Sequence, residues 1–451
     1  MRFYSRKILI LALAIILLSG HWLTVFAYEA NKSAVALLVA KNEVGKTVGT
    51  GSGFVIKPEG TLITNYHVLV DAHSIKAYFP NGIQARVTGI FKVDRIKDFA
   101  ILKLEDGFYS TLELGESANL KSYDYNSALG YLSENVKENN GIVEGVVAQT
   151  YGFILGIHPQ AFSNIPYLYT TTEFGPGFSG GPLVDKKNKV VGIATIEGRS
   201  INLALPIQNI KPYLNEKETF TFKELLQQDK NSIEAKYYRG NFYLNGMGDP
   251  NKAISEFEKI LAKDPNFTLA HYDLATAYGD LGMQEEAIRH YEKTIELQPH
   301  FPEALSNLGG FYFRIGKIEE AKNLFKRAIE AYPNFIQALS NLGAVLNKLD
   351  QPEKAIPHLK KTIALNPEFA IAYFNLGNSQ FALNRFDEAQ ISYKRSVELG
   401  LDFLSTHWKL YEIHLKNNAL KKAEEELKII LEIDPENEKA QKKLSKLPSI
   451  H

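Results

Sequence analysis

The sequence contains no cysteine among its 451 residues. This absence excludes disulfide bonds, zinc–thiolate sites, a cysteine nucleophile and a lipid anchor on an N-terminal cysteine. An excess of one charge is also missing, because Lys plus Arg and Asp plus Glu each number 51. A neutral chain gives no electrostatic reason to expect a nucleic-acid partner. The remaining composition is that of a globular protein, and the length suggests two or three domains.

The first 27 residues differ in character from the rest of the chain. Basic residues that include Arg2 precede an unbroken apolar run from Ile8 to Leu18. Ala27 then ends a short segment whose small residues have the spacing that signal peptidase recognises. We expect residues 1–27 to be a signal peptide cleaved after Ala27, which would make the mature protein periplasmic or secreted. The alternative is an uncleaved membrane anchor, because the stretch is just long enough to span a bilayer.

Residues 28–215 show short β segments divided by turns. Pro58-Glu59-Gly60 and Asn81-Gly82 are turn sequences. Many short strands without intervening helices are typical of a barrel or a sandwich. The predicted strands are Ala34–Ala40, Thr61–Asn65, Phe99–Leu104 and Val190–Thr195.

Residues 234–437 repeat with a period of 34, which is clearest in the alanines from Ala253 to Ala423 and the prolines from Pro265 to Pro367. The pattern resembles the tetratricopeptide repeat. The resemblance implies six helix–turn–helix units in which the small Ala lets two helices approach and the Pro ends the second helix. We expect residues 216–233 to form a linker and a leading helix, and residues 438–451 to form a capping helix. Such a domain implies a protein partner.

Three segments of the first half carry a chemical pattern. A segment predicted to be a β-strand ends near a single histidine, His67. Asp98 immediately precedes an apolar strand, and Ser179 stands among glycines that can expose its hydroxyl. Each alone has a structural explanation, such as a turn, a cap or a glycine-rich loop. Together, in the order His, Asp, Ser, they match one known arrangement of the serine-peptidase triad.

The three segments resemble chymotrypsin-fold peptidases, and most closely the HtrA/Deg branch. The motifs are Thr64–Val68, Asp94–Lys103 and Gly177–Leu183. The resemblance implies a double β-barrel, so the whole chain is predicted to be multidomain, with an all-β half followed by an all-α superhelix of repeats. Members of this branch normally carry PDZ domains after the peptidase, and this chain has helical repeats there instead.

The resemblance also implies roles for individual residues. His67 would be the general base, Asp98 its orienting carboxylate and Ser179 the nucleophile. The backbone N–H groups of Gly177 and Ser179 would form the oxyanion hole. One departure is Phe178, because the family usually has Asn before the serine, and we expect this side chain to point away from the hole. The mechanism requires no cofactor and no metal.

Two further sets of residues concern recognition. Glu173 lies six residues before Ser179, an offset that in this fold is near the base of the primary specificity pocket. It would favour Lys or Arg in the substrate, unless it faces solvent. Asn307, Asn341 and Asn375 repeat every 34 residues and resemble an asparagine ladder that holds a peptide backbone. The alternative is a role in helix packing or solubility.

The sequence therefore predicts a serine endopeptidase that cleaves proteins through an acyl-enzyme, with repeats that recruit substrates or partner proteins. The rival hypothesis is a repeat-based scaffold or envelope assembly factor with a weak or vestigial peptidase domain. The complete His67, Asp98 and Ser179 set argues against decay of the site.

Overall fold

The computed structural model describes residues 32–132, 137–139, 142–159, 165–175, 177–195 and 202–447. The expected signal peptide and its cleavage after Ala27 lie outside these ranges. The chain divides into two compact units, residues 1–290 and 291–451. Within the described ranges, no helix combines the length and the apolar character needed to cross a membrane.

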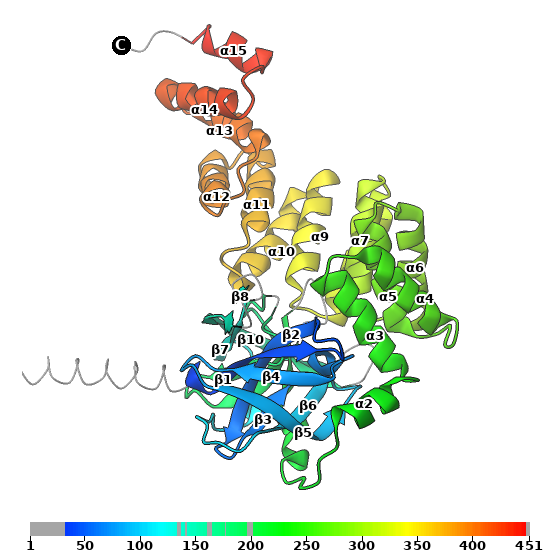
Figure 1. Cartoon of the computed structure of the whole chain (residues 1–451). Helices are drawn as coiled ribbons and strands as arrows, with labels where there is room; N and C mark the ends of the chain where they lie inside the picture. The colour runs from blue at the N-terminus through cyan, green and yellow to red at the C-terminus, as the bar shows by residue number, and fades with distance from the viewer. Residues whose placement is uncertain are drawn as a thin grey trace, which may run out of the picture. The chain divides into compact units, whose positions relative to one another are not determined.

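The first six strands of unit 1 form a closed antiparallel barrel (Figure 1). The predicted turn at Gly60 joins β2 to β3, and the turn at Gly82 joins β4 to β5. Both glycines have positive φ, 99° and 84°, as turn positions often require. The strands, which follow in the barrel order β1-β2-β3-β6-β5-β4, are β1 (Val35–Lys41), β2 (Thr47–Lys57), β3 (Thr61–Thr64), β4 (Ser74–Tyr78), β5 (Gln84–Asp94) and β6 (Phe99–Leu104).

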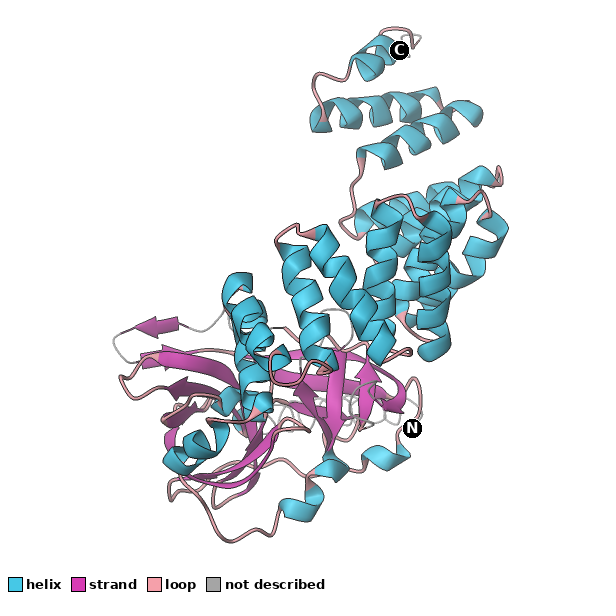
Figure 2. Ribbon diagram, turned by 90° about the vertical axis from the view of Figure 1, so that its right-hand side faces the viewer, coloured by secondary structure: helices cyan, strands magenta, loops and turns pink. Residues whose placement is uncertain are grey.

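A second closed barrel follows in the order β10-β11-β14-β13-β12-β7, and a two-stranded sheet of β8 and β9 stands apart from it. The predicted double barrel is thus confirmed, and Figure 2 shows its strands in magenta. The strands are β7 (Tyr125–Tyr131), β8 (Lys137–Asn139), β9 (Ile142–Glu144), β10 (Val147–Pro159), β11 (Pro166–Thr170), β12 (Pro182–Asp185), β13 (Val190–Thr195) and β14 (Asn202–Pro206).

The segment expected to be a linker and a leading helix is docked on the first barrel. Phe220 exchanges two backbone hydrogen bonds of 3.0 Å with Ile90 of β5. Helix α2 (Phe222–Asp229) then begins at a capping box in which Thr221 and Glu224 satisfy each other's backbone N–H groups. Leu225 of this helix is fully buried. Residues 216–233 therefore extend the barrel's packing rather than separating two domains.

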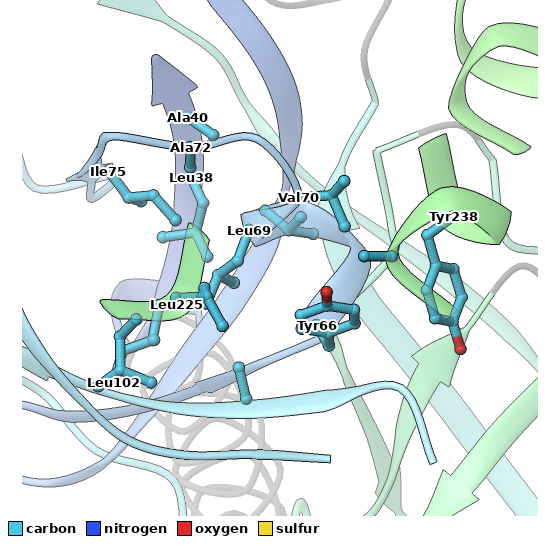
Figure 3. Close-up of a cluster of buried hydrophobic side chains, with 14 of the residues drawn as sticks. Leu38, Ala40, Tyr66, Leu69, Val70, Ala72, Ile75, Leu102, Leu225 and Tyr238 are labelled. Carbon is cyan, nitrogen blue, oxygen red and sulfur yellow. The ribbon is translucent and has the colours of Figure 1, made fainter. Parts of the chain in front are cut away.

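The core of the first barrel continues into the first helices of the repeat region. Leu38, Leu69 and Leu102 of the barrel belong to the same buried cluster as Leu225 of α2 and Tyr238 of α3 (Ile233–Asn241) (Figure 3). The cluster extends to buried side chains of α4 (Pro250–Leu261) and α5 (Thr268–Asp280). Burial of apolar surface therefore holds the first repeat helices and the barrel together.

Antiparallel helix pairs fill the remainder of the chain, as the period of 34 predicts. The repeated glycine of one helix lies against the large residue of the next, so that a Cβ on Gly309 would lie 2.8 Å from Phe325 and one on Gly343 would lie 2.6 Å from Leu359. The helices are α6 (Gln284–Leu297), α7 (Pro302–Arg314), α8 (Ile318–Ala331), α9 (Ile336–Lys348), α10 (Pro352–Leu365), α11 (Ala370–Ala382), α12 (Phe386–Glu398), α13 (Leu404–Lys416), α14 (Leu420–Ile433) and α15 (Glu438–Leu444), the last within the predicted capping segment.

Candidate active site

His67 and Asp98 are brought together by the first barrel. His67 lies in the short helical turn η1 (Tyr66–Leu69) that follows β3, and Asp98 lies at the end of the turn before β6. Because β3 and β6 are paired neighbours, the end of one and the start of the other meet. His67 Nδ1 is 2.7 Å from Asp98 Oδ2, and the His67 backbone N–H donates to Asp98 Oδ1 at 2.9 Å. The carboxylate therefore orients the imidazole through both of its oxygens.

Asp98 is held in place by its surroundings. It is fully buried, and its φ of 54° lies in the left-handed region that Asp tolerates better than most residues. The Asn65 amide donates to the Asp98 carbonyl at 2.7 Å, and the Thr195 hydroxyl donates to Asp98 Oδ2 at 3.2 Å. A buried carboxylate needs such donors. His67 keeps 26% of its side chain exposed, which leaves it accessible to a reactant.

Ser179 lies on a tight turn of the second barrel that is pressed against the first. The Ser179 carbonyl accepts a 2.8 Å hydrogen bond from the Ser52 N–H of β2. The next residue, Gly180, has a φ of 86°, and a Cβ there would lie 2.2 Å from the Ser52 carbonyl oxygen and 2.9 Å from the Asn65 nitrogen. Only glycine fits this position. The nucleophile candidate is thereby fixed beside the strand end that carries His67.

The turn before Ser179 carries the predicted oxyanion hole. Phe178 N–H donates to the Gly175 carbonyl at 3.0 Å, and Gly177 has a φ of 100°, a backbone angle that glycine adopts readily. The Gly177 carbonyl accepts from Ser52 Oγ at 2.7 Å, which anchors the turn to the first barrel. Pro176, whose placement sets the direction of the Gly177 N–H, lies outside the described residues.

Phe178 is the residue at which the sequence departs from the expected Asn. Its side chain is fully buried in the core of the second barrel and stacks on Phe174 with ring centroids 6.5 Å apart. Gly130 lies so close that a Cβ there would be 2.9 Å from the Phe178 ring. The buried Phe178 ring thus anchors the turn before Ser179 in the core of the second barrel.

Among the described residues, no hydrogen bond joins His67 to Ser179. Ser179 is 7% exposed, and its loop contacts the first barrel next to Val68, which follows His67. In peptidases without substrate the bond between nucleophile and base is often long, and it tightens when substrate binds. The arrangement therefore provides an oriented base and a fixed hydroxyl that a bound peptide can bring into reaction.

Comparison with known families agrees with this geometry. Residues 51–193 match the family model of the trypsin-like peptidase domain, a range that contains His67, Asp98 and Ser179. The chain carries a trypsin-like peptidase domain. Tetratricopeptide-repeat models match residues 234–266, 256–289, 280–346 and 340–400. The predicted combination of a peptidase domain and helical repeats is therefore confirmed.

The peptidase domain is similar to HtrA proteases. Serine protease HTR4 of Rattus norvegicus is 31% identical over 222 residues, 48% of this chain and 42% of its own. Serine protease HTRA2, mitochondrial, of Bos taurus is 33% identical over 177 residues, 38% of this chain and 37% of its own. Serine protease HTRA1B of Danio rerio is 32% identical over 173 residues, 38% of this chain and 35% of its own. The chain thus spans about two fifths of the length of these relatives.

Glu173 is exposed and lies six residues before Ser179. Its backbone carbonyl accepts a 2.7 Å hydrogen bond from Thr150 Oγ1, and its side chain faces solvent. A solvated carboxylate has no need of a substrate cation to offset its burial. The position therefore fits the alternative in which Glu173 stands outside a specificity pocket.

The three repeat asparagines do not occupy equivalent environments. Asn307 is half-buried and donates to the Tyr291 hydroxyl at 3.2 Å, Asn341 is exposed, and Asn375 is 8% exposed. The residues sixteen before Asn341 and Asn375 are Phe325 and Leu359, which carry no hydroxyl. The packing residue changes from one repeat to the next, so the three side chains differ in their surroundings, and the peptide-binding ladder stays a prediction.

Several residues next to the site escaped the sequence-based prediction. Tyr238 of α3 lies against His67, with ring centroids 5.9 Å apart. Arg95, three residues before Asp98, donates from Nε to Asp229 of α2 at 2.7 Å. Burial and the charge of Asp229 raise the pKa of the nearby Tyr66 phenol well above its usual value, which keeps that phenol neutral. No local motif marks these contacts, because they join residues far apart in sequence.

Proposed function

We propose that the protein is an exported serine endopeptidase that cleaves polypeptides by an acyl-enzyme mechanism. One observation carries the proposal: the buried Asp98 orients His67 through both carboxylate oxygens while the turn of Ser179 is fixed beside them. A serine hydroxyl becomes nucleophilic when a neighbouring base removes its proton. This arrangement supplies such a base, and the peptidase-domain match and the HtrA relatives support the same chemistry.

In this mechanism each group has one task. His67 takes the proton of Ser179 as the hydroxyl attacks the peptide carbonyl, and then gives it to the leaving amine. Asp98 keeps the imidazole in the tautomer that accepts at Nε2 and stabilises the imidazolium that forms. The N–H groups of Gly177 and Ser179 would stabilise the oxyanion, each contributing about 3 kcal/mol to lowering the barrier. Water then hydrolyses the acyl-enzyme by the same proton transfers in reverse.

The direct test compares the purified chain with its Ser179→Ala variant. Incubation with unfolded casein should produce fragments only from the unaltered chain. A serine-directed phosphonate reagent should add its mass to Ser179 of the unaltered chain and to no residue of the variant. Equal casein cleavage by both proteins, in a preparation free of other peptidases, would overturn the proposal and leave a repeat-based scaffold as the better account.

The repeats extend this function to the binding of protein substrates or partner proteins. Stacked repeats build an extended surface suited to polypeptides, and Asn307, Asn341 and Asn375 lie on the first helices of three successive units. Replacing all three by Ala should weaken the binding of unfolded casein while leaving the cleavage of a short peptide unchanged. Unchanged casein binding by a folded triple variant would remove these residues from the binding surface.

Export is the last part of the proposal. The basic, apolar and small-residue order of residues 1–27 supports a signal peptide, and a casein-degrading enzyme would then act outside the cytoplasm. The amino-terminal sequence of the protein recovered from an exporting cell tests this directly. A chain that begins at Tyr28 supports cleavage, and one that retains residues 1–27 in the membrane fraction supports the uncleaved anchor instead.

A further inference from the structure

The first repeat helix lies against the catalytic histidine. Figure 3 shows Tyr238 on green α3 facing the turn that carries Tyr66, and this turn is η1, which also holds His67. The Tyr238 ring lies 5.9 Å from the His67 ring at an interplanar angle of 30°, and 5.7 Å from the Tyr66 ring at 74°. An aromatic side chain of the repeat region is therefore part of the immediate surroundings of the proposed base.

Tyr238 is fixed between the two loops that flank His67. Its hydroxyl donates to the Arg95 carbonyl at 3.1 Å, in the loop that leads to Asp98. Its neighbour Arg239 donates two hydrogen bonds of 2.6 Å to Asp71, in the loop that follows η1. Tyr238 is 7% exposed. The hydroxyl of Tyr238 and the side chain of the next residue are thus both bonded to the barrel, which holds the Tyr238 ring beside His67.

The position of the ring determines which substrate residue it meets. Side chains of an extended peptide point alternately to opposite sides. In the binding mode that we infer, the residue whose carbonyl is attacked directs its side chain toward the barrel of Ser179, and the residue before it directs its side chain toward the barrel of His67. That second residue must share the space beside the imidazole with Tyr238.

We propose that Tyr238 is a specificity-determining residue of the peptidase, forming a rigid wall of the subsite beside His67 that admits small substrate side chains and excludes bulky ones. The inference rests on the proposed function and adds its substrate class: polypeptides with a small residue at the second position before the cleaved bond. The repeat region thus contributes to the choice of the cleaved bond itself, in addition to any binding along its helices.

Two peptides test this, identical except for Ala or Phe at the second position before the bond to be cut. The unaltered chain should cleave the Ala peptide at least about tenfold more efficiently, since a size-selective pocket discriminates by one to two orders of magnitude. In Tyr238→Ala the ratio of kcat/KM for the two peptides should fall toward one. Tyr238→Phe keeps the ring and should keep the ratio.

Phe257→Ala is the control. Phe257 of α4 is fully buried, and its ring packs on Tyr237, 6.0 Å away, while Tyr237 in turn packs on Tyr238 at 5.4 Å. Phe257 therefore belongs to the same core, one side chain further from His67, and its replacement should lower stability without changing the ratio. If Tyr238→Ala lowers the cleavage of both peptides equally, as Phe257→Ala would, Tyr238 only supports the fold and the proposal fails.

A binding measurement separates this inference from the proposed catalysis. Both fluorescently labelled peptides are titrated into Ser179→Ala and into the Ser179→Ala, Tyr238→Ala double variant. A gain in affinity for the Phe peptide alone in the double variant supports the wall, even if the unaltered chain cleaves nothing and the proposed function fails. Unchanged relative affinities, together with casein cleavage by the unaltered chain, overturn the wall and leave the proposed function standing.

Discussion

Arg239 and Asp71 form a bidentate ion pair, with Nε and Nη2 of the guanidinium each 2.6 Å from a different carboxylate oxygen. The pair joins the first repeat helix to the loop just after His67. A second pair, Arg95 with Asp229, joins α2 to the loop just before Asp98. The loop that follows His67 and the loop that precedes Asp98 are thus each attached to a helix outside the barrel. This attachment leads to the first prediction.

Asp229→Asn should destabilise unit 1 by about 2 kcal/mol, because it leaves the half-buried Arg95 without its counter-charge. The midpoint of chemical denaturation, followed by fluorescence, measures the loss. Glu424→Gln is the control, since it breaks the ion pair with the exposed Lys428 and should change stability by less than about 0.5 kcal/mol. Equal losses of stability in the two variants would show that the ion pair of Asp229 with Arg95 contributes no more to stability than an exposed pair.

Asp98→Asn should lower kcat on the order of ten-thousand-fold while the protein stays folded. The amide can accept at only one end, whereas Asp98 now accepts from the His67 backbone at Oδ1 and faces His67 Nδ1 and Thr195 at Oδ2. The imidazole would then adopt the wrong tautomer. Steady-state cleavage of a peptide measures the change.

Thr195→Val is the matched control for Asp98. It removes one 3.2 Å hydrogen bond to the same carboxylate and leaves the charge in place. The loss of one hydrogen bond of this kind should lower kcat by no more than about tenfold. If Thr195→Val and Asp98→Asn are equally impaired, packing around Asp98 and not its charge controls the activity.

Gly180→Ala should prevent the Ser179 turn from forming, with loss of peptidase activity and of thermal stability. An added Cβ would lie 2.2 Å from the Ser52 carbonyl oxygen. Gly82→Ala is the control that distinguishes backbone strain from a steric clash. The φ of Gly82, 84°, is nearly that of Gly180, 86°, but no atom lies within 4 Å of a Cβ added at Gly82. Gly82→Ala should cost only about 1 kcal/mol in stability. Similar melting temperatures for the two variants would contradict the collision.

Glu303 should make the stability of unit 2 depend on pH. It lies in the first turn of α7, and burial raises its pKa to about 7. The folded state therefore binds this proton more tightly than the unfolded chain, whose glutamates titrate near 4.3. The contribution of Glu303 to the stability of unit 2 is greatest below about pH 4.3, falls as the pH rises toward 7, and levels off above it, a total loss of about 4 kcal/mol.

Glu303→Gln removes this titration and should flatten the dependence. The stability of the variant should rise relative to that of the unaltered chain as the pH is raised from 5 to 8, as measured by the denaturation midpoint at each pH. Glu353→Gln, which removes an exposed carboxylate from the first turn of α10, should show no such gain. A pH-independent difference between Glu303→Gln and the unaltered chain would contradict the assignment.

Local pattern was enough to predict much of the fold. The strand Phe99–Leu104 follows from its apolar run, and the repeat helices follow from alanines and prolines at a fixed spacing. The candidate triad was also predictable, because His67, Asp98 and Ser179 each lie in a short motif. These features depend on neighbours within a few residues, or on a period that shows itself many times.

Contacts between distant residues could not be predicted in this way. Tyr238 contacts His67 from a helix that the period alone would assign to a separate domain. The sequence around each of the two residues contains no signal for this contact. The environment of Asn307 depends on whether the residue sixteen before it carries a hydroxyl, which the repeat pattern leaves open. Such outcomes are set by which surfaces pack together.

The shared core of the barrel, α2 and the first repeat helices has a consequence for how this protein can be altered. Cutting at the change of composition near residue 215 would expose Leu225's partners in the barrel and remove Tyr238 from beside His67. The exchangeable part of the chain begins instead beyond α5, where that core ends. Later repeats can be lengthened, shortened or replaced without disturbing that core, whereas the first repeat helices must be kept together with the peptidase domain.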